Sequence, residues 1–94
     1  MPRFMIQRTF GMRDEADMQN LGARSARIAD EKFPEITWEH SHIVSDSFGA
    51  IKSFCIYKAP TEQMVHEHAQ MLGEHQVDFV YEIAGDIGPE DFRP

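Results

Sequence analysis

The amino-acid sequence predicts an α+β protein in which two helices cover one face of a four-stranded antiparallel sheet. Three observations support this fold class. Four stretches alternate side chains of different character with the period of two that is typical of strands. Two further stretches repeat apolar residues at helical spacing and carry capping residues at their ends. The resulting order, β-α-β-β-α-β, is that of the ferredoxin-like fold.

The first strand is predicted over Arg3–Phe10, and Gly11 ends it. Along this strand, one face carries Phe4, Ile6, Arg8 and Phe10. The first helix is predicted over Asp14–Phe33, with Asp14 as the N-cap and Pro34 as the residue that stops it. Its buried stripe is expected to consist of Met18, Leu21, Gly22, Ser25, Ile28 and Ala29.

A hairpin is predicted over Ile36–Lys58, with a turn at Asp46–Gly49 that pairs Ser45 with Ala50. Counting back from this turn, the expected opposed pairs are His42 with Ser53, His40 with Cys55, and Trp38 with Tyr57. Opposed residues have Cβ atoms about 4.5–5.5 Å apart, so two imidazoles and a thiol are expected to meet on one patch of sheet. A one-residue change in loop length would flip this register.

The second helix is predicted over Thr61–Leu72, with Thr61 as the N-cap and Gly73 just beyond the end. Its apolar stripe places His68 toward the sheet. His66 lies about 200° around the helix from His68, so the two histidines do not form a chelating pair. We expect His66 and His75 to be exposed to solvent.

The fourth strand is predicted over Val77–Ile83, and a polar tail follows at residues 85–94. We interpret residues 1–94 as one ferredoxin-like domain. The sheet face away from the helices is too apolar for water, which predicts a homodimer that pairs two sheets.

Composition narrows the function classes. The formal charge is −7, from 16 acidic residues against 9 Lys and Arg, which disfavours nonspecific binding to nucleic acid or to an anionic membrane. The single cysteine is typical of a reducing compartment. No apolar run approaches the ~18 residues of a membrane span. We therefore expect a soluble cytoplasmic protein.

Four segments resemble a family of small nickel-binding proteins with a dimeric ferredoxin-like fold, formerly a domain of unknown function. They are RTF near the start, ITWEHSHIV, FCIYKAP and VHEHA. The most specific part is Cys-x-Tyr-x-Ala-Pro, here Cys55 to Pro60, followed by a helix containing His68. This chain has His42 where relatives often have an aromatic residue. The resemblance implies a dimeric α+β barrel that binds metal.

The candidate metal ligands are His40, His42, Cys55 and His68. Imidazole and thiolate suit Ni, Zn or Cu, and the resemblance makes Ni²⁺ the first expectation. If the His/Cys face of the hairpin meets the second helix, one subunit holds the whole site. If that face is the open one, His68 is separated and a second subunit completes the site. The alternative roles are ordinary ones, with Cys55 as a small buried hydrophobe and His68 as a hydrogen-bonded core residue.

Three functions compete on this basis. The first hypothesis is a small metal-binding protein for nickel storage, buffering or sensing. The alternative is a small dimeric α+β-barrel enzyme of the oxygenase or isomerase type. In that enzyme, His40 would act as general base in a pocket lined by Trp38 and Tyr57. The third hypothesis is an interaction module. The fold does not choose among them, because this architecture hosts many activities.

Overall fold

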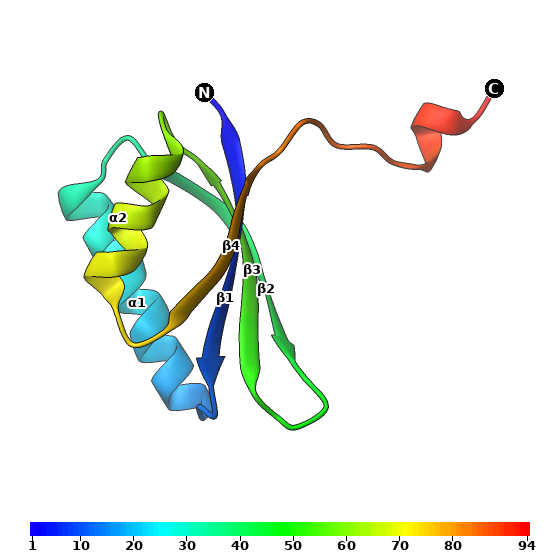
Figure 1. The fold of residues 1–94 in the computed structure, drawn as a ribbon. Coiled ribbons are helices and arrows are strands. Elements are labelled where there is room, and N and C mark those ends of the chain that lie inside the picture. The colour runs from blue at the N-terminus through cyan, green and yellow to red at the C-terminus, as the bar shows by residue number, and fades with distance from the viewer.

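A computed structural model describes residues 1–94 and confirms the predicted fold class. The elements follow one another in the order β-α-β-β-α-β (Figure 1). Their bounds are β1 Arg3–Gly11, α1 Glu15–Lys32, β2 Thr37–Ser45, β3 Ile51–Lys58, α2 Glu62–Leu72 and β4 Gln76–Glu82. A short 3₁₀ helix, η1, follows at Pro89–Phe92 in the tail.

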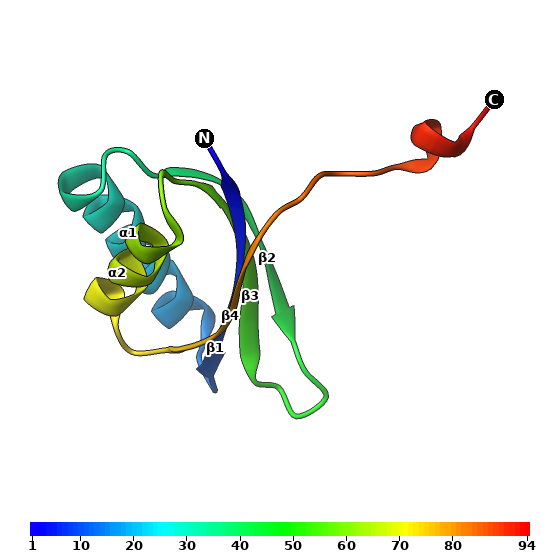
Figure 2. The ribbon, with the colours of Figure 1, turned by 45° about the horizontal axis from the view of Figure 1, so that its top comes forward.

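The four strands form one antiparallel sheet in the order β2-β3-β1-β4. Figures 1 and 2 show both helices on the same side of this sheet. We call the side that the helices cover the inner face and the opposite side the open face. No helix packs on the open face. The inner face therefore packs against the helices, and the open face is turned toward solvent.

Both helices begin at the residues that the sequence indicates. The Asp14 side chain accepts a hydrogen bond from the Asp17 backbone N–H at 2.8 Å, and the Thr61 hydroxyl accepts one from Met64 at 3.2 Å. These caps satisfy donors that the first turn of a helix leaves free. Each helix then buries one stripe, which comprises Leu21, Ser25 and Ala29 in α1 and Val65, His68, Ala69 and Leu72 in α2.

The hydrophobic core lies between the inner face and the two helices. Its members come from strands, helices and connections alike. They are Phe4, Ile6, Phe33, Ile36, Cys55, Tyr57, Ala59, Val65 and Ala69. The odd-numbered residues of the middle of β1 point to the open face, and the even-numbered ones point into this core.

The register of the hairpin differs from the predicted one over most of its length. Ser45 pairs with Ile51 rather than with Ala50, because the connection is longer than a turn at Asp46–Gly49. Asp46 organises this connection, since its Oδ1 accepts from the backbone N–H of Phe48 at 2.8 Å and of Ala50 at 3.0 Å. The predicted pairs His42–Ser53 and His40–Cys55 are therefore wrong. His42 lies opposite Phe54, and His40 lies opposite Ile56.

A β-bulge at Glu39 restores the predicted pairing at the start of β2. Trp38 pairs with Tyr57 and His40 pairs with Ile56, so Glu39 is the extra residue between them. Trp38 consequently lies on the inner side although His40 and His42, at even spacing from it, lie on the open face. The predicted Trp38–Tyr57 pair is confirmed.

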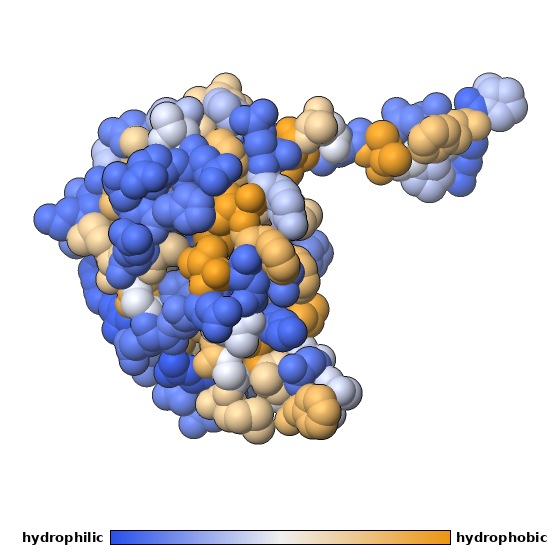
Figure 3. Space-filling view, in the orientation of Figure 1, coloured by the Kyte–Doolittle hydropathy of each residue, from blue (hydrophilic) through white to orange (hydrophobic).

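Apolar side chains gather on the open face and on the tail. Among the exposed residues are Met5 at 38%, Val44 at 39%, Phe79 at 51% and Tyr81 at 59%. Figure 3 shows a mainly hydrophilic surface over the helices and more hydrophobic surface along the sheet and on the tail. The tail leaves the end of β4 and extends away from the rest of the chain (Figures 1 and 2).

Candidate functional site

The two hairpin histidines form a pair on the open face. His40 and His42 are both exposed, and their ring centroids lie 5.3 Å apart with the planes at 79°. Both side chains project from β2 at alternate positions, which keeps them on one side of the sheet. Their cross-strand neighbours on β3 are Ile56 and Phe54. The pair therefore presents two imidazoles beside an apolar surface, and imidazole is a good ligand for Ni, Zn and Cu.

The carboxylate next to this pair in sequence is already engaged. Glu39 accepts two hydrogen bonds from Arg3, from Nε at 2.8 Å and from Nη2 at 3.2 Å. Arg3 also bonds Asp86 of the tail at 2.6 Å. The hydrogen bonds from Arg3 hold the pKa of Glu39 below its usual range, so this carboxylate is charged and paired.

The other two predicted ligands lie on the inner side of the sheet. Cys55 is buried, and its thiol donates to the Ser53 hydroxyl at 3.4 Å. His68 is 1% exposed, and its Nε2–H donates to the Ser25 backbone carbonyl at 3.0 Å. Burial lowers the pKa of His68, so the ring is neutral. The structure thus separates His40 and His42 from Cys55 and His68, and no three His, Cys, Asp or Glu side chains gather closely enough to hold a metal ion.

A cavity of about 400 Å³ lies between α1 and the inner face. We call it the α1 cavity. The two predicted pocket residues, Trp38 and Tyr57, both line it, and so does Cys55. His40 does not line it, because the register places that imidazole on the open face. The pocket-enzyme hypothesis required His40 as its general base, and this placement contradicts that role.

Arg8 also lines the α1 cavity, and it was missed as a functional candidate. It is 2% exposed, and its Nη2 donates to the Tyr57 hydroxyl at 3.2 Å. Its Nε is buried without any hydrogen-bond partner. Arg8 occupies the buried side of a strand, between Ile6 and Phe10. A charged residue at that position of the alternating pattern is the signal that could have identified it.

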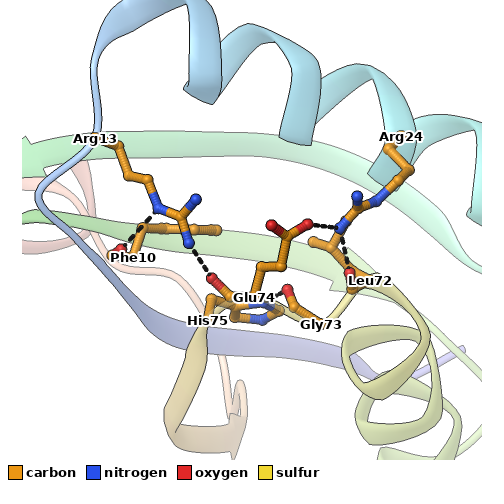
Figure 4. Close-up of polar contacts among 7 residues, drawn as sticks. All are labelled: Phe10, Arg13, Arg24, Leu72, Gly73, Glu74 and His75. Carbon is orange, nitrogen blue, oxygen red and sulfur yellow. Dashed lines mark hydrogen bonds and ion pairs between the residues drawn. The ribbon is translucent and has the colours of Figure 1, made fainter.

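Two arginines hold the turn between α2 and β4 (Figure 4). Arg13 donates to the Glu74 backbone carbonyl at 2.6 Å, and Arg24 donates to the Glu74 carboxylate at 2.6 Å. Arg24 also bonds the carbonyl of Leu72, which lines the cavity. The hydrogen bond from Arg24 lowers the pKa of Glu74. These contacts tie α1 and the segment before it to the turn.

His75 follows this turn and is partly buried, in contrast to the predicted exposure. Its ring stacks on Phe10 with centroids 5.0 Å apart, and its Nδ1–H donates to the Gly73 carbonyl at 2.7 Å (Figure 4). Burial lowers the pKa of His75. His75 is therefore a neutral packing residue that supports Phe10, and Phe10 lines the α1 cavity. His66 is half-exposed and contacts Glu62 at 3.1 Å.

The fold and the open-face imidazole pair define a small ferredoxin-like protein with a candidate transition-metal surface. No helix of the chain is long and apolar enough to cross a membrane. Residues 4–83 match the sequence profile of the SCO4226-like nickel responsive proteins, and the chain belongs to this family. The resemblance seen in the sequence is thereby confirmed. No protein of curated function matches the chain.

Two solved structures share the fold. The crystal structure of SCO4226 from Streptomyces coelicolor A3(2) matches with a TM-score of 0.68 and 14% identity, over 90% of this chain and 99% of that one. Formyltetrahydrofolate deformylase from Burkholderia mallei ATCC 23344 matches with a TM-score of 0.55 and 11% identity, over 90% of this chain and 30% of that one. At these identities the likeness shows the fold alone, which hosts many activities.

Proposed function

We propose that this chain is a small metal-binding protein that takes nickel, or a similar divalent transition metal such as zinc or copper, for storage, buffering or sensing. The observation that carries the proposal is the exposed His40–His42 pair in a chain of a nickel-responsive family. Two imidazoles at alternate positions on one face of β2 supply nitrogen donors that these metals favour. The single buried thiol supports a reducing, cytoplasmic location.

The proposal assigns the metal to the open face. The sheet lies between His40 and His42 on one side and Cys55 and His68 on the other, so the four predicted ligands cannot share one ion in this arrangement. His68 in α2 also donates a hydrogen bond from Nε2 to the backbone carbonyl of Ser25 in α1. We therefore propose His40 and His42 as ligands, and we give Cys55 and His68 no part in the open-face site.

Two imidazoles leave a transition metal with open coordination positions, and a second copy of the chain is the proposed source of further donors. A homodimer that pairs two open faces would cover exposed Met5, Val44, Phe79 and Tyr81. In a two-fold dimer the same patch meets itself, so each subunit would bring its own histidine pair to the interface. This dimer is the expected α+β barrel.

Metal binding is tested by calorimetric titration of Ni²⁺ and Zn²⁺ into protein purified without a histidine tag. We expect saturable binding that weakens on acidification, because a proton competes with the metal for each ligating imidazole nitrogen. His40→Ala and His42→Ala should each lower the nickel affinity by about tenfold or more. Even the loss of a residue that only hydrogen-bonds a metal ligand lowers metal affinity by about 10–100-fold.

The matched control is His66→Ala, because His66 lies on the outer side of α2 and its ring contacts Glu62 at 3.1 Å. It should leave the nickel affinity unchanged. Equal binding by His40→Ala, His42→Ala and His66→Ala would refute the open-face site. Sedimentation with and without Ni²⁺ tests the dimer, and a mass of one chain under both conditions at micromolar concentration would contradict it.

A further inference from the structure

Arg8 is a buried cation without an anionic partner. Its side chain is 2% exposed, yet no carboxylate lies within ion-pair distance of it. Glu15 is the acidic residue that lines the same cavity, and it forms no ion pair with Arg8. Burying a charge is costly unless the charge is paired. A chain with 16 acidic residues has left this one guanidinium unpaired inside its own fold.

The hydrogen bonds of Arg8 are also incomplete. A guanidinium has five N–H donors. In Arg8, Nη2 donates to the Tyr57 hydroxyl at 3.2 Å and Nε has no acceptor. The Tyr57 hydroxyl accepts from Arg8 and keeps its own proton, because burial raises the pKa of Tyr57 to about 12. Arg8 thus leaves N–H donors unused beside Tyr57, which lines the same cavity.

The space beside these donors has the size and walls of a small-molecule site. The α1 cavity of about 400 Å³ falls in the range of ligand pockets, about 300–1,000 Å³. Its walls are mainly hydrophobic and include Phe10, Met18, Leu21, Trp38, Ile43 and Leu72. Arg8 is the one positively charged residue among the residues that line it.

Gly22 keeps the helix side of the α1 cavity open. It lies within α1, where glycine stabilises a helix less than alanine does. A Cβ atom built at this position has no other atom within 4 Å, so packing against a neighbour does not require the glycine. Gly22 lines the α1 cavity and adjoins open space, so we expect a large side chain at this position to take up part of the cavity.

We propose that the α1 cavity binds a small organic monocarboxylate with a compact apolar body, of about the size of an aromatic ring. The carboxylate accepts from Arg8 and Tyr57, and the apolar body packs against the walls of the cavity. This site lies on the inner side of the sheet, so it is independent of the proposed metal site on the open face. Either proposal stands if the other fails.

The probes are benzoate, benzamide and inorganic phosphate, each titrated separately into the metal-free chain and followed by NMR. Benzoate should bind saturably and shift resonances of residues around the cavity, including Trp38. Benzamide has the same body without the charge and should bind at least about tenfold more weakly, because hydrogen bonds between two charged groups are stronger than those to a neutral amide. Phosphate has the charge without the body and should also bind more weakly.

Two variants act on the site by different routes. Arg8→Gln removes the charge and should abolish the preference for benzoate over benzamide. Gly22→Leu keeps Arg8, fills the cavity and should abolish binding of both, while the helix gains a better helix former. The matched control is Arg27→Gln, which removes an exposed arginine of α1 and should leave benzoate binding unchanged.

Equal affinity for benzoate and benzamide would overturn the role of Arg8. If phosphate bound as tightly as benzoate, the proposal that an apolar body packs against the cavity walls would be overturned. Unchanged benzoate binding in Gly22→Leu would overturn the assignment to the α1 cavity, even if Arg8→Gln failed to fold.

Discussion

Acidification from about pH 7.5 to about pH 5.5 should destabilise the folded chain through two histidines that it holds neutral. Burial lowers the pKa of both His68 and His75, with a smaller contribution from the charge of Arg8. A histidine with a lowered folded pKa contributes stability that is fully present above the unfolded pKa near 6.5. That stability is lost as the pH falls from this value toward the folded pKa, because the unfolded chain takes up the proton first.

The magnitude follows from the burial of His68. At about pH 5.5, the unfolded ring is roughly ten times more often protonated than neutral, which is worth about 1.4 kcal/mol. If the ring stays neutral in the folded chain, the free energy of unfolding falls by this whole amount. His68 is 1% exposed and donates to the Ser25 carbonyl, so this amount is the upper limit of its share and His68 should contribute more than His75. His75 is less buried and should contribute less.

Urea unfolding at several pH values measures the effect. The free energy of unfolding should fall in wild type across this range, and His68→Gln should show a smaller fall because glutamine does not titrate. Identical pH slopes for the two proteins would refute the reasoning. So would stability that declines only below about pH 4.5, where carboxylates such as Glu39 and Glu74, whose pKa values are lowered, lose their contribution.

Three further outcomes are expected. Burial raises the pKa of Tyr57 to about 12, so in a spectrophotometric pH titration its phenolate absorbance should appear near that pH and be absent in Tyr57→Phe. If the phenolate absorbance of Tyr57 instead appeared near the ordinary tyrosine value of about 10, the titration would contradict the burial. Ile56→Ala should cost about 2–5 kcal/mol in urea unfolding, since Ile56 is 6% exposed although it points to the open face. A much smaller loss would mean that its neighbours do not enclose it. Glu74 has a φ of 60°, so Glu74→Gly should destabilise the chain less than Glu74→Ala does, and the reverse order would show that backbone strain at this turn is negligible.

Local signals in the sequence were enough to predict the elements and their order. Asp14 and Thr61 begin the helices as N-caps, and Gly73 follows the second helix at a φ of 64°. These features depend on residues within one turn of each other. The predicted bounds therefore agree with the observed ones to within about one residue, with β4 shifted by one position.

The candidate site was less predictable because it depends on strand register. A loop one residue longer than assumed places His40 and His42 opposite Ile56 and Phe54, away from Cys55. Loop length in turn depends on how Asp46 bonds the backbone of the connection, which spacing alone does not reveal.

The cavity was partly visible in the sequence. The pairing of Trp38 with Tyr57 was predicted, and Arg8 appeared on the same face as Ile6. The absence of a partner for Arg8 became evident only once the whole inner side was assembled, because the acidic residues that could have paired with it come from distant parts of the chain.

The extra residue at Glu39 also determines where this chain tolerates a change in length. Trp38 and His40 already occupy consecutive register positions, opposite Tyr57 and Ile56. Deleting Glu39 would therefore regularise the strand without moving any side chain across the sheet, at the cost of the contacts with Arg3. A single deletion within His40–Ser45 would instead invert the orientation of part of the strand. When relatives that differ by one residue in this strand are aligned, the gap belongs at Glu39.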